Sequence, residues 1–159
     1  MNPDKEFIFI GPIWKDAQTE KLSHFNNVVF TGRVPHNNAA QYLADFSVAI
    51  VPHKQTAFTH SMNTMKVYEY LAAGLPVVST CAMDGVEKFL MIAKTPGEFS
   101  SAIEQAMKEN TQERIAERQA FARAHSWKSR VDAMMGIIKV NYNDQGKIPM
   151  SKSQSNLKS

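Results

Sequence analysis

The sequence predicts an α/β domain built on a parallel sheet with helices on both faces, a three-layer arrangement. Short unbroken apolar runs recur along the chain, and such runs are typical of strands buried on both faces. Segments with helical spacing lie between them, and this alternation favours a parallel sheet. The 159 residues fit one domain, and 43% apolar with 21% charged residues is ordinary for a globular chain. Collagen-like, coiled-coil and wholly disordered chains are excluded.

Five apolar runs are expected to form the strands. Turn residues punctuate them: Gly11-Pro12 follows the first run, Thr31-Gly32 the second and Pro52 the third. The fourth run comes directly after the tight turn Gly74-Leu75-Pro76. The predicted strands are residues 7–10, 28–30, 48–51 and 77–79, with a weaker one at 90–93.

Helical patterns fill the intervals after the second strand. The segment at 63–73 has apolar residues at helical spacing and a glycine stop at Gly74. Ser126 is expected to cap the last helix, which begins near Trp127. The other predicted helices are residues 38–45, 99–108 and 112–124.

The charge of the chain is concentrated in its last residues. The formal net charge is +3, and residues 143–159 carry three lysines against Asp144, which leaves +1 for residues 1–142. We therefore expect a domain over residues 1–142 and a disordered, polar, basic tail over residues 143–159. The body has no run of basic residues with interleaved aromatics, so no nucleic-acid partner is expected.

The sequence favours a cytoplasmic protein. Cys81 is the single cysteine, which suits a reducing compartment and excludes an intrachain disulfide. No signal peptide or bilayer-spanning run is visible. The basic tail leaves open a peripheral contact with the inner face of a membrane.

The polar loop 54–63 and the helix after it are the best candidate for a binding site. The loop follows the third strand at its carboxyl end, where open α/β sheets bind ligands. The helix start favours an anion such as a diphosphate, by about 0.3–1 kcal/mol per exposed interaction. Glu69, in an otherwise apolar helix, would bind a pair of sugar hydroxyls or would face solvent, and its spacing does not separate these alternatives. Histidines lack metal-ligand spacing, no Asp-x-Asp pair is present, and no metal site is expected.

The run MNTMKVYEYLAAGLPVVST at 62–80 resembles the nucleotide-sugar signature of GT-B glycosyltransferases, family-4-like, whose usual form is close to NPLKLYEYLAAGKPVVAT. FTGRVPHNNAAQYLADFSVAIVP at 30–52 is similar to the segment before that signature, 7–11 to an earlier strand, and HSWKSRVDAM at 125–134 to the closing helix. The resemblance covers roughly residues 6–140. It implies a Rossmann-like fold, one half of a GT-B enzyme. The implied activity is hexosyltransferase-like, in polysaccharide biosynthesis.

The resemblance also implies roles for residues of the donor site. Glu69 would bind the ribose of a nucleoside diphosphate sugar such as a UDP-sugar, and Lys66 would be a charge partner of the diphosphate. No cofactor is expected beyond this donor substrate. The backbone of Gly32, Arg33 and Val34 would border the base, and Met62, Asn63 and Thr64 would face the diphosphate or sugar.

The chain departs from the family pattern in two ways. Ser61 stands where many members carry a glutamate that contacts the donor sugar. The N-terminal acceptor domain, with the catalytic base, and the first strand and helix of the donor domain have no counterpart in these residues. Because that first strand is central in the 3-2-1-4-5-6 order, two inner strand edges are expected to pair with each other or stay open.

Two readings of function follow. In the first, the chain is the donor-binding part of a glycosyltransferase that moves a sugar to an acceptor hydroxyl without a metal. No catalytic residue is assigned in the chain. Alternatively, it is a non-catalytic module that binds a nucleotide-sugar or completes a second chain, as a fragment or a split protein.

Overall fold

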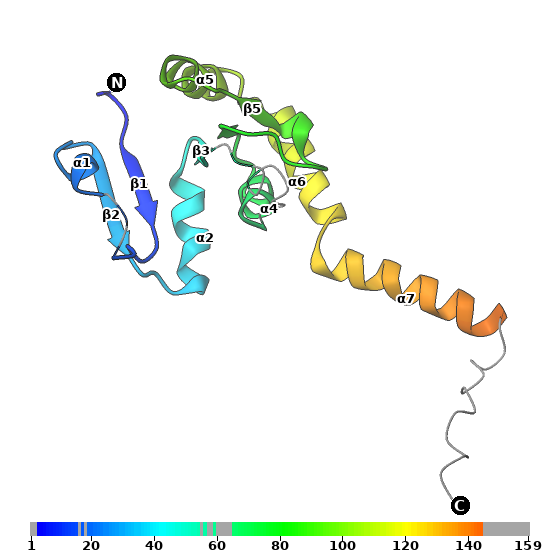
Figure 1. Ribbon diagram of the computed structural model, residues 1–159. Helices are drawn as coiled ribbons and strands as arrows, with labels where there is room; N and C mark the ends of the chain where they lie inside the picture. Colours follow the sequence, from blue (N-terminus) through cyan, green and yellow to red (C-terminus); the bar gives the residue numbers. More distant parts are fainter. Residues whose placement is uncertain are drawn as a thin grey trace, which may run out of the picture. The chain divides into compact units, whose positions relative to one another are not determined.

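The strands of the computed structural model run parallel wherever they pair, as the sequence predicts. The model describes residues 3–15, 17, 19–54, 56, 59 and 65–144. Its strands are β1 (Phe7–Ile10), β2 (Val28–Gly32), β3 (Ala49–Val51), β4 (Val77–Ser79) and β5 (Leu90–Ile92), all shown in Figure 1. β1 pairs with β2, β3 with β4, and β4 with β5. The prediction of an α/β fold with a parallel, Rossmann-like sheet is confirmed.

The longer helices lie where the sequence places them, with small shifts at their starts. They are α2 (His36–Asp45), α4 (Met65–Ala72), α5 (Pro96–Lys108), α6 (Gln112–Ala124) and α7 (Trp127–Asp144). The α5 helix begins before the predicted residue 99, because Thr95 and Glu98 form a capping box with Pro96 in the first turn. Two short elements were not predicted: α1 (Glu20–Ser23) and the 3₁₀ turn η1 (Glu87–Phe89).

The chain divides into two compact units, Met1–Ala122 and Arg123–Ser159. In the second unit, the predicted cap of α7 is confirmed, because the Ser129 N–H donates to the Ser126 Oγ over 3.2 Å. This helix extends to Asp144, two residues into the expected tail, and residues 145–159 lie outside the described part of the chain.

Among the described helices, none is long and apolar enough to cross a membrane. Exposed apolar side chains on α7 are Trp127, Val131, Met134, Met135, Ile137 and Ile138.

Alternate residues of β3, β4 and β5 pack into two separate cores, one on each face of this sheet. Val77 belongs to the core that includes Val67 and Leu71 of α4. Val78, its neighbour in β4, belongs to the core that includes Ile103 of α5. Because successive strand residues point to opposite faces, α4 and α5 lie on opposite sides of the sheet and the fold has three layers.

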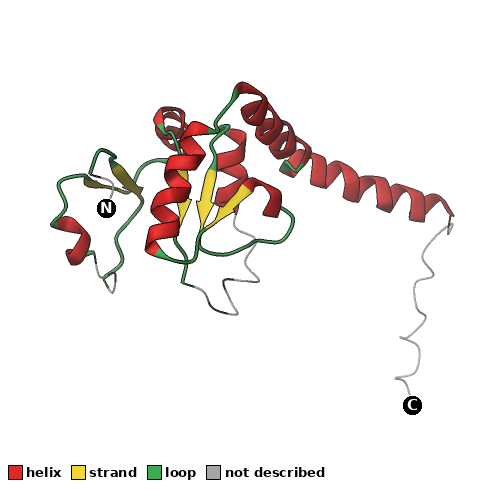
Figure 2. Ribbon diagram, turned by 90° about the horizontal axis from the view of Figure 1, so that it is seen from above, coloured by secondary structure: helices red, strands yellow, loops and turns green. Residues whose placement is uncertain are grey.

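The sheet is in two pieces, β1–β2 and β3–β4–β5 (Figure 2). None of the described strands pairs with the second edge of β1 or of β3. The order of the strands is the one expected if the central strand of a 3-2-1-4-5-6 sheet were left out. Of the two outcomes predicted for the inner edges, the structure shows the open one.

A glycine turn and a buried arginine join α4, β4 and α6. Gly74 ends α4 with φ +82°, and its N–H donates to the Leu71 carbonyl. Arg118 of α6 is buried, and its Nε donates to the Gly74 carbonyl over 3.0 Å. A guanidinium nitrogen of Arg118 also donates to the Asn110 side-chain oxygen. This junction fixes the end of α4 against the start of the central strand of the three-stranded piece.

Gly74→Ala is predicted to destabilise the protein more than Gly85→Ala. Both glycines have φ +82°, so an alanine at either position costs roughly 1–2 kcal/mol of backbone strain. Only at Gly74 would the new Cβ meet other atoms, Ile115 Cγ2 at 2.7 Å and Gln119 Nε2 at 3.2 Å. Overpacking adds about 1–3 kcal/mol. Urea unfolding of the two variants measures the difference, and equal losses of stability would contradict the role given to this contact.

Candidate functional site

The carboxyl ends of β1 and β2 are tied together by a backbone hydrogen bond. The Gly11 N–H donates to the Gly32 carbonyl over 3.0 Å, and the Thr31 hydroxyl donates to the same oxygen over 3.1 Å. Gly32 turns the chain at this point with φ +70°. Arg33 follows with its side chain exposed, and Val34 is half-buried. The predicted base-binding turn is therefore fixed by its own backbone and open to solvent.

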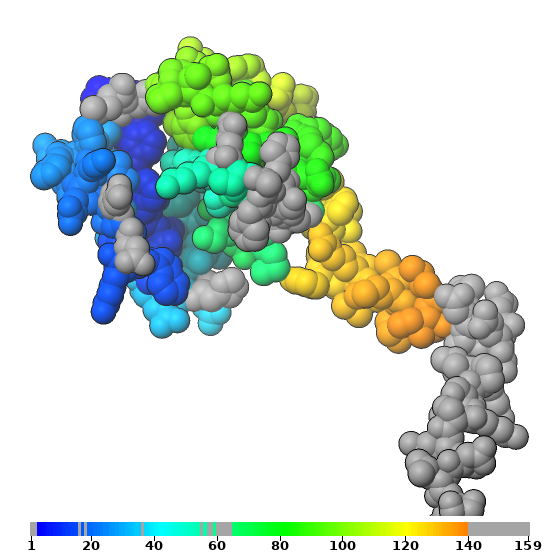
Figure 3. Space-filling view, viewed as in Figure 1, coloured from blue at the N-terminus to red at the C-terminus, as the bar shows by residue number. Residues whose placement is uncertain are grey.

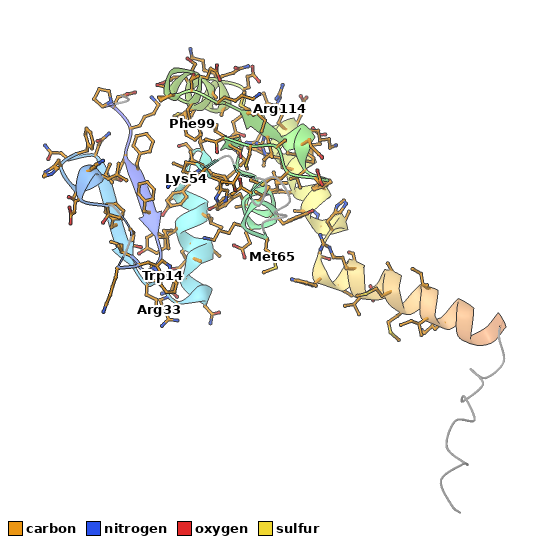
Figure 4. All side chains as sticks on the ribbon, viewed as in Figure 1. Trp14, Arg33, Lys54, Met65, Phe99 and Arg114 are labelled. Atoms are coloured by element: carbon orange, nitrogen blue, oxygen red, sulfur yellow. The ribbon has the colours of Figure 1, made fainter. Side chains whose placement is uncertain are left out.

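Trp14 is a candidate site residue that the sequence did not reveal. Its side chain is 79% exposed, the largest exposed fraction among the large apolar residues of the described chain. It follows β1 at the same end of the β1–β2 pair as Arg33 (Figure 4). A flat, exposed aromatic surface suits the stacking of a base. The only sequence signal was an aromatic residue shortly after the Gly11-Pro12 turn.

The carboxyl ends of β3 and β4 are tied in a similar way. The Thr80 hydroxyl donates to the His53 carbonyl over 2.5 Å, and the Thr80 N–H donates to the Val51 carbonyl. Beyond them, the Thr59 hydroxyl donates to the Lys54 carbonyl over 2.6 Å. These bonds fix the chain directly after β3. The predicted site residues Ser61, Met62, Asn63 and Thr64 lie outside the described residues.

The α4 helix buries one side and exposes the other. Val67 and Leu71 have no exposed surface, whereas Lys66 and Glu69 are exposed. None of the described residues donates a hydrogen bond to the Glu69 carboxylate, and its exposure removes the desolvation cost expected for a carboxylate in an apolar helix. Lys66 and Glu69 are three residues apart, so they project from the same side of the helix. Both are accessible to a ligand.

The predicted site residues form two groups. Gly32, Arg33 and Val34 belong to the β1–β2 piece, and Lys66 and Glu69 belong to the helix that follows β3. Within the described residues, no hydrogen bond or ion pair joins one group to the other. The described residues also contain no group of three or more metal-ligating side chains. Cys81 is buried as a free thiol.

Comparison with known proteins identifies the family. The model of a family described as "Glycosyl transferases group 1" matches residues 2–109, more than half of the chain. The chain belongs to this glycosyltransferase family. The matched residues include all five strands and the α4 helix with Lys66 and Glu69.

A curated relative of this chain comes from Bacillus subtilis (strain 168). Its name is "Putative teichuronic acid biosynthesis glycosyltransferase TuaH", and it is 29% identical over 134 residues. The similarity covers 79% of this chain and 34% of the relative. The chain therefore spans about a third of the length of the curated relative that it matches.

Tyr70 of α4 is predicted to make stability fall at high pH. Burial raises the pKa of its phenol, and the nearby Glu69 carboxylate raises that pKa further. A raised pKa means that the unfolded chain loses this proton first, so stability is complete below about pH 10 and decreases as the pH rises further.

Urea unfolding between pH 8 and roughly pH 11 tests this expectation. Tyr70→Phe should show a smaller loss of unfolding free energy than the wild type over this range. Tyr42→Phe, at an exposed tyrosine of α2, is the matched control and should keep the wild-type slope. The expectation is wrong if the Tyr70→Phe slope equals that of the wild type.

Proposed function

We propose that this chain is the donor-binding part of a glycosyltransferase that transfers a sugar from a nucleoside diphosphate sugar to an acceptor hydroxyl. The observation that carries the proposal is the exposed pair Lys66 and Glu69 on α4, a helix that follows the carboxyl end of β3 in a chain of a glycosyltransferase family. Open α/β sheets bind ligands at this edge.

Each group would bind a different part of the donor. The carboxylate of Glu69 can accept hydrogen bonds from both ribose hydroxyls. Lys66 and the start of the helix segment would stabilise the negative charge of the diphosphate. Arg33 and Trp14 would bind the nucleotide base, with the backbone of the Gly32–Val34 turn alongside. UDP-sugars are the donors to test first, and GDP-sugars are the alternative.

The reaction would depend on stabilisation of the leaving diphosphate rather than on a base in this chain. Charge develops on the diphosphate as the glycosidic bond to it breaks, and fixed cations and N–H groups aimed at that charge lower the barrier. Glu69 would position the donor by its ribose contact and would not accept a proton. We propose that no metal is needed, since the sequence has no Asp-x-Asp pair to hold one on the diphosphate. The acceptor site and the base would lie outside residues 1–159.

We further propose a cytoplasmic protein that acts in polysaccharide biosynthesis. The name of the Bacillus subtilis relative supports the pathway class, and the free thiol of Cys81 suits a reducing compartment. The exposed apolar residues of α7 and the lysines after it are compatible with peripheral contact with an anionic membrane surface.

The second candidate function is a non-catalytic module that binds a nucleotide-sugar or completes another chain. One observation favours it: Ser61 stands where many family members carry a glutamate that contacts the donor sugar. This module would keep the Glu69-dependent donor site and would lack turnover.

Glu69→Ala is predicted to weaken the binding of UDP or a UDP-sugar about 10- to 100-fold, because a hydrogen bond to a charged group contributes roughly 1.5–3 kcal/mol. Isothermal titration calorimetry with UDP, UDP-glucose and GDP-mannose measures the effect. Glu113→Ala, at an exposed glutamate of α6, is the matched control and should bind as the wild type does. Equal affinities of the wild type and Glu69→Ala for every nucleotide would remove Glu69 from the site.

The purified 159-residue chain is predicted to transfer or hydrolyse no measurable sugar, since it has no assigned base or acceptor site. Release of UDP from UDP-glucose, measured with and without simple sugar acceptors, tests this prediction. Turnover that disappears in Glu69→Ala would show that the chain is a complete catalyst.

A further inference from the structure

A cavity of about 90 Å³ lies at the amino ends of β4 and β5. It is lined by Pro76 and Val77 at the start of β4, by Leu90 at the start of β5, and by residues from the end of α5 and one side of α6. Figure 3 shows these parts of the chain in green and yellow, next to each other on the surface of the first unit. The candidate donor site is at the carboxyl ends of the strands, so this cavity is separate from it.

One charged side chain in the lining of this cavity is buried. Arg118 has only 6% of its surface exposed. Its Nε donates to the Gly74 carbonyl, and one of its two terminal nitrogens donates to the Asn110 side chain. A guanidinium carries five N–H donors, and no residue in the described part of the chain accepts a hydrogen bond from its other terminal nitrogen. The cavity therefore borders a buried cation that can donate to one more partner.

Two further cations, Lys88 and Arg114, line the cavity at its exposed rim. Lys88 Nζ lies 3.1 Å from a Glu117 carboxylate oxygen, and an Arg114 terminal nitrogen lies 3.4 Å from a Glu109 carboxylate oxygen. Exposed ion pairs of this kind contribute little to stability, so both cations can turn towards an anion in the cavity. With Arg118, the lining has three cations against these two carboxylates, a balance of +1.

The charges around Arg118 favour an anion beside it. Burial lowers the pKa of its guanidinium, the nearby charge of Arg114 lowers that pKa further, and the Glu117 carboxylate offsets only part of the two effects. An anion in the cavity would compensate both the burial and the repulsion between the two arginines. The planar fork of an arginine matches the oxygens of a phosphate group, and the volume of the cavity restricts the bound group to a small one.

We propose that a phosphate group binds in this cavity at the amino ends of β4 and β5. The second terminal nitrogen of Arg118 donates to it from the buried side, and Arg114 and Lys88 donate to it from the rim. Because Arg118 also donates to the Gly74 carbonyl, the bound phosphate stabilises the junction of α4, β4 and α6. The group is either free inorganic phosphate or the phosphate of a larger molecule that extends from the rim into solvent.

The test is an NMR titration of the full, nitrogen-labelled chain with inorganic phosphate, in which sodium chloride keeps the ionic strength constant. The Arg118 Nε–H and the backbone amides of Leu90 and Met91 should show saturable shifts, with a dissociation constant on the order of 1 mM. Shifts that grow without saturation, or no shift at Arg118, would overturn the proposal. Shifts confined to Lys66 and Glu69 would place the phosphate in the proposed donor site and would contradict it equally.

Variants of the rim test the geometry independently. Arg114→Gln and Lys88→Gln should each weaken phosphate binding about tenfold, because each removes a hydrogen bond from a charged donor. Lys128→Gln is the matched control, since Lys128 is an exposed lysine of α7 whose ion pair with Asp132 resembles that of Lys88. It should bind phosphate as the wild type does. Unchanged affinity in both rim variants would overturn the proposal. Circular dichroism checks that the variants fold, and the wild-type titration remains decisive if any does not.

A second probe, glucose 1-phosphate, separates the two sources of the phosphate group. Tighter binding of this sugar phosphate than of inorganic phosphate, with the same shift at Arg118, would assign the cavity to the phosphate of a larger molecule. Equal or weaker binding would assign it to free phosphate, and both results support the site. Binding of neither probe would overturn it. No nucleotide is used, so failure of donor binding leaves this test unaffected.

Discussion

The hydrogen bond from the buried Arg118 to the Gly74 carbonyl supports the part of the fold on which the donor site depends. The guanidinium remains charged, although burial lowers its pKa, and the nearby Arg114 lowers that pKa further. A buried charge is stable only when its donors are satisfied, and here the Gly74 carbonyl and the Asn110 side chain accept from it. Arg118 therefore fixes the turn that ends α4 and begins the approach to β4. Any change in this turn would move Glu69, which lies little more than one helical turn before Gly74.

The open sheet has a consequence for the proposed binding of the donor. Arg33, Trp14 and the Gly32 turn belong to the β1–β2 piece, while Lys66 and Glu69 belong to the helix that follows β3. A nucleotide-sugar that contacts both groups would span the two pieces, and its affinity would depend on how firmly they are held together. The Lys5–Glu104 ion pair and the packing of Phe7 on the α5 core connect β1 to the other piece.

The sequence predicted the strands and the longer helices and missed the two short elements that have no buried residue. The strands were found because a strand covered on both faces reads as a continuous apolar run, as in Ala49–Val51. The α1 helix has four residues and no buried side chain, so no periodic pattern marked it. Arg118 was overlooked in a helix that reads as strongly charged, because composition does not show which one of several charged residues is buried. The spacing of Glu69 did not decide between a carboxylate that binds sugar hydroxyls and one that faces solvent, and its exposure reflects the narrow buried stripe of Val67 and Leu71 on α4.

The family signature at 62–80 combines residues that serve the fold with residues available to a ligand. Val67, Leu71, Leu75, Val77 and Val78 are buried, and they form the two cores with Gly74 at the junction. Lys66 and Glu69 are the exposed charged residues of the same run. A match over the buried positions follows from packing alone, because any chain with this strand–helix–strand arrangement must fill the same cores. Chemical specificity therefore depends on the few exposed positions and on the residues just before α4 in the sequence, where Ser61 departs from the family pattern. For this reason the match to the family predicts the fold of this chain more strongly than it predicts the donor sugar.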